Sequence, residues 1–273
     1  HSLIKAVGFT GSLGGGRALF DLCARRPEPI PFFGELGSIN PMFILPAAAK
    51  ARGADIGTGW AGSLTMGAGQ FCTNPGVLIV VGDKNTDVFI ETAKNLAAQV
   101  VDQTMLTDSI ASAYRTGRGR LAQIQGVDEV YTSNCNQRLA SPSIFQTTAS
   151  IWLEHEELRE EVFGPLGIVV IADDIEEMRK AALFMQGQLT CTLQMDENDL
   201  EFAQSLMVIL ERKAGRILVN GFPTGVEVAD AMIHGGPYPA STNFGATSVG
   251  TLAIRRFLRP VCYQNLPDGL LKY

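Results

Sequence analysis

The sequence has few histidines, no paired cysteines and little charge. Three histidines occur in 273 residues, and none belongs to a His-x-x-x-His motif, so we expect no metal site. An odd number of cysteines without a Cys-x-x-Cys pair argues against a disulfide framework. It is typical of reduced thiols, and we expect a cytoplasmic protein. The five cysteines are Cys23, Cys72, Cys135, Cys191 and Cys262.

The sequence also lacks a large excess of charge of one sign, and it lacks long apolar runs. Charged residues make up 18% of the chain, the net charge is −6, and lysine and arginine are scattered. We therefore expect no nucleic-acid partner and no anionic membrane surface. The apolar stretches at 76–82 and 162–172 are shorter than the roughly 20 residues of a membrane helix, so we expect no membrane. We find no signal-peptide pattern, and the start runs straight into a strand-like segment, so we expect a piece of a longer chain.

Short apolar runs alternate with amphipathic segments along the chain. The pattern predicts strands at 3–10, 32–36, 41–45, 76–81, 127–131, 167–172, 190–194 and 216–220. It predicts a turn at 14–16 and helices at 17–26, 50–69, 87–101, 108–121, 175–185 and 198–213. The apolar stripe of the last helix is Leu200, Ala203, Leu206 and Ile209. Residues 234–243, rich in Gly, Pro, Ser and Thr, predict a long loop. Such alternation is typical of an α/β fold with a largely parallel sheet.

Cys72 ends the segment Gly-Ala-Gly-Gln-Phe-Cys, directly before a predicted buried strand. Small residues ahead of a cysteine let the backbone approach whatever the sulfur attacks, and a lowered thiol pKa would supply a nucleophilic thiolate. The competing interpretation is a buried structural cysteine, because free cysteines are among the most buried residues. The residues alone leave both interpretations open.

Two glutamates and one glycine-rich turn also allow both an ordinary structural interpretation and a functional one. Glu35 is the only charge in an apolar run, so it either faces solvent or lies in a partly dry pocket. In such a pocket desolvation raises its pKa toward that of a general base. Glu161, before Val-Phe-Gly-Pro, could simply end a helix. The segment Gly-Ser-Leu-Gly-Gly-Gly at 11–16 could approach a phosphate at a helix N-terminus, or form an ordinary strand–helix turn.

The order of four blocks resembles the aldehyde dehydrogenase superfamily. They are Phe-Thr-Gly-Ser ending at Ser12, Glu-Leu-Gly from Glu35, Gly-Gln-Phe-Cys ending at Cys72, and Glu-Val-Phe-Gly-Pro from Glu161. The resemblance runs over essentially the whole chain. It implies an α/β aldehyde dehydrogenase-like catalytic domain at 38–250 and a remnant of the dinucleotide-binding domain at 1–37. Residues 251–273 would form a C-terminal tail used in oligomerisation.

The resemblance also implies the chemistry. Cys72 would attack an aldehyde, hydride would pass to the nicotinamide of NAD or NADP, and a thioester would remain. Glu35 would activate the water that hydrolyses this thioester. The backbone N–H of Cys72 would supply one donor of the oxyanion hole.

Five residues are implied in cofactor binding: Gly11, Ser12, Gly16, Glu161 and Phe163. Glu161 would hold the nicotinamide ribose, with Phe163 packed beside it. Gly11 and Ser12 would meet the phosphates, and Gly16 would close the turn. Asn220 matches an asparagine near the family's active site, without a definite role.

Two departures from the family pattern narrow the resemblance. Ser38 stands where the family has glycine, and residues 234–243 replace the usual Pro-Phe-Gly-Gly loop. The segments at 145–148, 190–192 and 234–261 are similar to one branch, which contains α-ketoglutaric semialdehyde (2,5-dioxovalerate) dehydrogenases and NADP-linked aldehyde dehydrogenases. This implies a small aldehyde substrate, α-ketoglutaric semialdehyde, and a homo-oligomeric full-length parent.

Two other hypotheses remain at this point. Most of the family's dinucleotide-binding domain has no counterpart in the sequence, so the chain could be a catalytically inactive structural or partner-binding module. An acylating dehydrogenase that passes the thioester to coenzyme A is the third possibility. The presence of Glu35 argues against it, because that base serves hydrolysis.

Overall fold

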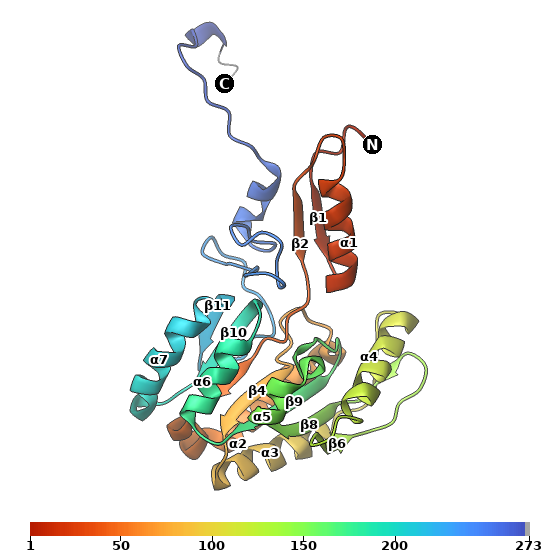
Figure 1. Ribbon diagram of the computed structural model, residues 1–273, viewed down its shortest axis with the longest axis vertical. Coiled ribbons are helices and arrows are strands. Elements are labelled where there is room, and N and C mark those ends of the chain that lie inside the picture. The colour runs from red at the N-terminus through yellow and green to blue at the C-terminus, as the bar shows by residue number, and fades with distance from the viewer. Residues whose placement is uncertain (271–273) are drawn as a thin grey trace.

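The computed structural model describes residues 1–270. A small sheet of two parallel strands, β1 (Val7–Thr10) and β2 (Phe32–Glu35), packs against helix α1 (Leu13–Ala24). These elements stand beside a larger sheet, from which they are visibly separate (Figure 1). The strands predicted at 3–10 and 32–36 are therefore present, although β1 begins only at Val7.

Helix α1 begins earlier than the sequence pattern predicts. Ser12 caps the helix, since its side chain accepts a hydrogen bond from the Gly15 N–H at 3.3 Å. The predicted turn at 14–16 is therefore wrong, because these glycines form the first helical turn. Glycine is a poor helix former, so tertiary packing and not local propensity makes these three residues helical. A Cβ at Gly16 would lie 2.0 Å from Cδ2 of Leu36, so glycine lets α1 pack against the segment after β2.

The larger sheet has seven strands within the described residues, and it confirms the predicted α/β fold. Their order is β11 (Ala214–Val219), β10 (Gln188–Gln194), β3 (Met42–Ile44), β4 (Val77–Val81), β9 (Leu166–Ala172), β8 (Ser143–Thr148) and β6 (Asp128–Thr132). All neighbouring pairs are parallel except β6 with β8. A separate antiparallel pair joins β5 (Gln103–Thr104) to β7 (Leu139–Ala140).

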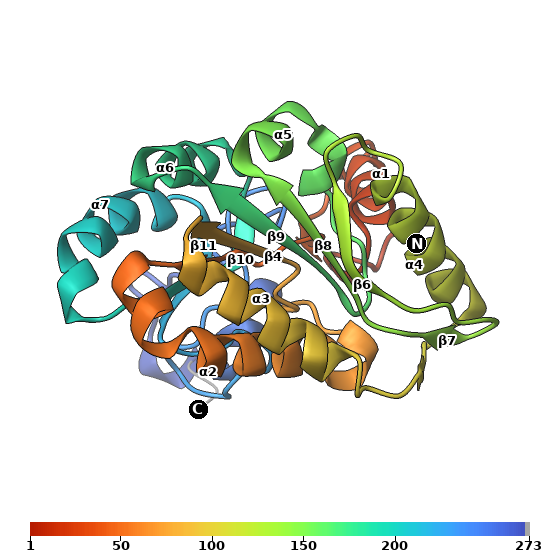
Figure 2. The ribbon, with the colours of Figure 1, turned by 90° about the horizontal axis from the view of Figure 1, so that it is seen from below.

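Helices cover both faces of the larger sheet (Figure 2). One face carries α2 (Pro46–Thr65) and α3 (Lys84–Ala97), whose Trp60 and Phe89 rings lie 5.6 Å apart in the core. The other carries α5 (Ala149–Glu154), α6 (Ile175–Phe184) and α7 (Leu200–Leu210). Helix α4 (Asp108–Leu121) joins the same core cluster through the buried Tyr114. The 3₁₀ helices are η1 (Met66–Gly69), η2 (Glu156–Arg159), η3 (Glu197–Asp199), η4 (Thr251–Phe257) and η5 (Asp268–Leu270).

One position of the predicted stripe on α7 is wrong. Ala203, Leu206 and Ile209 are buried, but Leu200 is 54% exposed. The preceding residue, Asp199, takes the buried place, because its carboxylate accepts hydrogen bonds from the first N–H groups of α2. That contact fixes where α7 begins and turns Leu200 outward.

The segment at 234–243 forms no named strand, as the sequence predicts. It makes a single bridge, from Ser241 to Glu35. After η4 the chain leaves the body as an extended segment (Figure 1). Within the described residues, none of the helices combines the length and the apolar character needed to cross a membrane.

Candidate active site

Cys72 lies in a tight loop between η1 and β4. Gly67, Ala68 and Gly69 have left-handed backbone angles, with φ of 56°, 58° and 64°. A Cβ at Gly69 would lie 2.3 Å from the carbonyl carbon of Gly164, so only glycine allows the two segments to touch. The loop before Cys72 therefore lies directly against the Glu-Val-Phe-Gly-Pro block.

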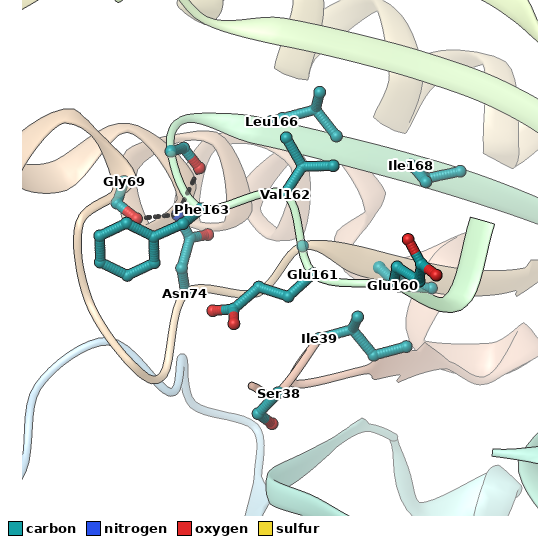
Figure 3. Close-up of a pocket in the computed structure, with 13 residues that line it drawn as sticks. Ser38, Ile39, Gly69, Asn74, Glu160, Glu161, Val162, Phe163, Leu166 and Ile168 are labelled. Carbon is teal, nitrogen blue, oxygen red and sulfur yellow. Dashed lines mark hydrogen bonds between the residues drawn. The ribbon is translucent and has the colours of Figure 1, made fainter. Parts of the chain in front are cut away.

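Asn74 holds these two segments together. Its Nδ2 donates hydrogen bonds to the carbonyl oxygens of Gly69 at 2.8 Å and of Gly164 at 3.0 Å (Figure 3). It also lies 3.2 Å from the carbonyl oxygen of Leu64, at the end of α2. Asn74 is buried, so these bonds are not exchanged with water. One amide thus joins a helix, the cysteine loop and the start of β9.

A second buried network connects the segment after Glu35 to the cysteine loop. Asn40, with φ of 46°, donates from Nδ2 to the Cys72 carbonyl at 2.8 Å. Its Oδ1 accepts hydrogen bonds from the hydroxyl groups of Ser38 at 2.9 Å and Thr190 at 3.0 Å. Gln188, at the start of β10, accepts from the Ile39 N–H at 2.8 Å, and its Oε1 lies 2.9 Å from the Ser38 hydroxyl, whose one proton it shares with Asn40. The serine that departs from the family pattern is therefore part of the network that positions Glu35 relative to Cys72.

Glu35 and Cys72 come together around His234. The Nε2 atom of His234 lies 3.1 Å from Sγ of Cys72 and 3.1 Å from Oε1 of Glu35. The Ser248 hydroxyl donates its one proton to the other oxygen, Oε2, of Glu35, and the Ser248 N–H donates to the His234 carbonyl at 2.8 Å. Glu35 and His234 are buried, and Cys72 is partly exposed. The structure therefore brings the two predicted catalytic residues into one cluster.

His234 and Ser248 were not predicted as functional residues. In the sequence His234 is only the first residue of the segment that replaces the family's Pro-Phe-Gly-Gly loop. The sequence offered one signal for His234, its position at the start of a segment that differs from the family pattern. Its distance of 199 residues from Glu35 puts the contact beyond any spacing argument.

Burial and hydrogen bonding act on the two reactive groups in different directions. Burial, and then the charge of Glu35, raises the pKa of the Cys72 thiol to about 12. Burial also pushes the pKa of Glu35 upward, but hydrogen bonds from His234 and Ser248 outweigh it and leave this pKa below its ordinary value. Of the two interpretations of Glu35, the buried one is confirmed, whereas the rise of its pKa that went with that interpretation is wrong. The resting site holds a neutral thiol beside a carboxylate.

A cleft of about 610 Å³ lies at the N-terminus of α1, and two of the residues implied in cofactor binding line it. Ser12, at the N-terminus of α1, and Glu161 lie in its wall, together with Gly14, Arg17 and Ser38. The α1 N-terminus presents free backbone N–H groups, which suit a phosphate.

Gly11 and Gly16 lie close to this cleft without being among its lining residues. The Gly11 N–H donates to the Glu35 carbonyl at 3.1 Å. Gly16 is buried against Leu36. In this structure both glycines therefore position α1 and the base.

Glu161 and Phe163 extend from the chain before β9 (Figure 3). The Glu161 side chain points toward the space between Ser38 and Asn74. Desolvation raises the pKa of Glu161 to about 8, and the charge of Glu35 adds to this rise. The chain before Glu161 is a 3₁₀ turn, η2, and Glu160 is extended, so Glu161 does not end an α-helix.

Asn220 lies away from this cluster. Its Oδ1 accepts hydrogen bonds from Nη2 of Arg52 at 3.1 Å and from the N–H of Met195 at 2.9 Å. These contacts hold the end of β11 against the segment after β10.

Comparisons with known proteins agree with this geometry. The profile of the Aldehyde dehydrogenase family matches residues 1–248. The chain belongs to the aldehyde dehydrogenase family. It is 49% identical over 273 residues to alpha-ketoglutaric semialdehyde dehydrogenase 2 of Azospirillum brasilense, covering 99% of this chain and 52% of that protein. It is 46% identical over 274 residues to alpha-ketoglutaric semialdehyde dehydrogenase of Acinetobacter baylyi, with 99% and 52% covered.

The fold is also that of a solved family structure. A 1-pyrroline-5-carboxylate dehydrogenase from Thermus with bound NAD superposes with a TM-score of 0.76 at 19% identity, covering 95% of this chain and 50% of that one. At this identity the match supports the fold alone. The chain spans about half the length of the curated relatives it matches.

Proposed function

We propose that this chain carries the catalytic centre of an NAD(P)-dependent aldehyde dehydrogenase that oxidises a small aldehyde to its carboxylic acid. The observation that carries the proposal is the meeting of Cys72, Glu35 and His234 through contacts of 3.1 Å, at an open pocket that all three side chains line. A nucleophile and a carboxylate base are the two groups that such an oxidation and hydrolysis require.

The first half of the reaction uses Cys72. Its thiol is neutral at rest, so the proton has to leave as sulfur attacks the aldehyde carbon. The ionised Glu35, which hydrogen-bonds the thiol, accepts this proton and passes it to solvent before the second half of the reaction. The backbone N–H of Cys72 lowers the thiol pKa, but burial and Glu35 outweigh it. In the proposal, this N–H is one donor to the oxyanion of the hemithioacetal. A bound NAD or NADP would supply the hydride acceptor, and Cys72 would then hold the acyl group as a thioester.

The second half uses Glu35. Hydrogen bonds from His234 and Ser248 keep Glu35 ionised, so it can take a proton from water without first losing one of its own. The hydroxide equivalent attacks the thioester carbon, the carboxylic acid leaves, and the thiolate of Cys72 regains a proton. Because its pKa is lowered, Glu35 is ionised and available as a base at neutral pH, but its affinity for the proton of water is low.

The cofactor is NAD or NADP, and the described residues fit its diphosphate and its nicotinamide ribose. The free N–H groups at the α1 N-terminus and the Ser12 hydroxyl suit the diphosphate, and the carboxyl of Glu161 suits ribose hydroxyls. A Cβ at Gly37 would lie 3.0 Å from Oε2 of Glu161, so glycine there leaves this carboxyl its space.

The substrate we propose is α-ketoglutaric semialdehyde, with α-ketoglutarate as the product. Support comes from the two relatives of that name, at 49% and 46% identity over nearly the whole chain. In the same proposal, residues 1–37 belong to the dinucleotide-binding domain and 38–250 to the catalytic domain, which agrees with the separate small sheet. Residues 251–273 would serve oligomerisation of a cytoplasmic homo-oligomer.

The experiment is reduction of NAD and NADP by the semialdehyde, with Cys72→Ala as the test variant. We expect Cys72→Ala to abolish reduction, and Cys262→Ala, in the exposed tail, to keep it. Reduction that survives in Cys72→Ala would contradict the assignment of the nucleophile.

Calorimetric titration of the chain with NAD and NADP distinguishes the proposed enzyme from the competing hypothesis, a non-catalytic module. Binding of either dinucleotide together with turnover supports the enzyme. A folded chain that binds neither and does not turn over supports the module.

A further inference from the structure

The cluster of Glu35, Cys72 and His234 has a second chemical property, which does not depend on aldehyde oxidation. One carboxylate oxygen, one thiol sulfur and one ring nitrogen all lie within 4.8 Å of one another. We propose that these three atoms form a site for Zn²⁺, and that the ion blocks the nucleophile and the base together. The sequence alone led us to expect no metal site, because the three residues are 37 to 199 positions apart and follow no motif.

The distances suit a tetrahedral ion. With Zn–S of about 2.3 Å and Zn–N and Zn–O of about 2.0–2.2 Å, tetrahedral ligand atoms lie roughly 3.4–3.6 Å apart. The sulfur–nitrogen and nitrogen–oxygen distances are 3.1 Å each, so the side chains need to move apart by only a few tenths of an ångström. Thiolate, imidazole and carboxylate are ligands that Zn²⁺ combines in proteins.

The surroundings also fit an ion site. The Ser248 hydroxyl holds Oε2 of Glu35 and leaves Oε1 directed at His234. An open pocket of about 460 Å³ includes all three side chains, which gives the ion a path and leaves room for a water as fourth ligand. Within the described residues Nδ1 of His234 has no hydrogen-bond partner, so the ring lacks the outer contact that strengthens most zinc histidines. We therefore expect reversible binding and not a permanent structural zinc.

Binding has a definite proton balance. A Zn–S bond forms, the S–H bond of Cys72 breaks, and the proton is released to solvent. A Zn–N bond forms at Nε2 of His234 as the proton that Nε2 shares with Glu35 leaves it and the ring takes the tautomer protonated at Nδ1. Glu35 is already ionised and binds without losing a proton. The resting site carries the single negative charge of Glu35, and Zn²⁺ together with the new thiolate brings it to neutrality, which offsets the repulsion that Glu35 exerts on a free thiolate.

The experiment adds Zn²⁺, and Co²⁺ as its coloured substitute, to the purified chain without aldehyde or dinucleotide. We expect about one equivalent of Zn²⁺ by calorimetry and a thiolate-to-cobalt charge-transfer band. Cys72→Ser should lose the band, and His234→Ala and Glu35→Gln should weaken Zn²⁺ binding at least tenfold. His155→Ala is the matched control, because this histidine lies outside the cluster beside Glu157. No band in the wild type, a band that survives in Cys72→Ser, or unchanged affinity in His234→Ala would overturn the proposal.

A measurement on the wild type alone guards against variants that do not fold. Zn²⁺ should protect Cys72 from alkylation by iodoacetamide, detected by peptide mapping, while the exposed Cys262 continues to react. Equal alkylation of Cys72 with and without the ion would contradict the site. None of these measurements needs turnover, so they separate the zinc proposal from the proposed function.

Discussion

At the scale of single residues, the site keeps a proton on Cys72 and none on Glu35. The carboxylate raises the pKa of the thiol, and this repulsion is removed only when the proton is transferred or the charge of Glu35 is neutralised. Each unit of pKa changes the thiolate fraction about tenfold. A thiol with a pKa of about 12 is therefore almost entirely protonated at pH 8.

The effect of Glu35 on Cys72 predicts the outcome of Glu35→Gln. Removing the negative charge lowers the pKa of the thiol, so we expect Cys72 alkylation to become several-fold faster at pH 8–9 and its pH profile to move to lower pH. Burial still acts, so the pKa stays above that of a free thiol. The measurement is the rate of carboxamidomethylation of the Cys72 peptide against pH.

Glu160→Gln is the control for this experiment. Glu160 neighbours Glu161 in the chain but is exposed and pairs with Arg120 at 2.9 Å, so its removal should leave the profile unchanged. Slower alkylation in Glu35→Gln would show that Glu35 mainly assists, and does not oppose, loss of the thiol proton.

At the scale of elements, α1 shows how one glycine positions the base. Gly16 has no room for a Cβ because Leu36 lies against it, and Leu36 directly follows Glu35. By contrast, a Cβ at Gly14 meets nothing within 4 Å. The two glycines are two residues apart in the same helix, so they form a matched pair.

We predict opposite effects of alanine at these two positions on stability. Gly16→Ala should lower the free energy of unfolding by about 1–3 kcal/mol, because the methyl group overpacks against Leu36. Gly14→Ala should raise it by about 0.5–1 kcal/mol through better helix propensity. Urea unfolding monitored by circular dichroism measures both. If Gly16→Ala proved as stable as Gly14→Ala, the close packing of α1 on Leu36 would be disproved.

The elements that carry apolar periodicity could be predicted from the sequence, and those that do not could not. Strand β8 was missed because Ser143, Gln146 and Thr147 interrupt its apolar pattern, although the strand pairs with neighbours on both sides. The start of α1 was missed because glycine favours turns. The blocks around Cys72 and Glu35 were found, but His234 was not, because only the folded chain brings it to them.

At the scale of the whole molecule, the site is assembled from distant parts of the chain. The base ends β2, the nucleophile precedes β4, and the histidine lies within the long segment between β11 and η4. Asn40 joins the segment after β2 to the cysteine loop, and Asn74 joins that loop to the chain before β9, both through buried hydrogen bonds. The chain spans about half the length of its curated relatives, so turnover by this polypeptide is the property most in need of a test.

The central claim is that Cys72 carries the acyl group and Glu35 releases it, and trapping in Glu35→Gln tests it most directly. The variant is mixed with α-ketoglutaric semialdehyde and NAD or NADP, NAD(P)H is followed by absorbance, and the acyl group is located by peptide mass. We predict about one equivalent of NAD(P)H, then a stall, with the acyl group on Cys72, whereas the wild type continues. Steady turnover like that of the wild type, or an acyl group on another residue, would contradict the account.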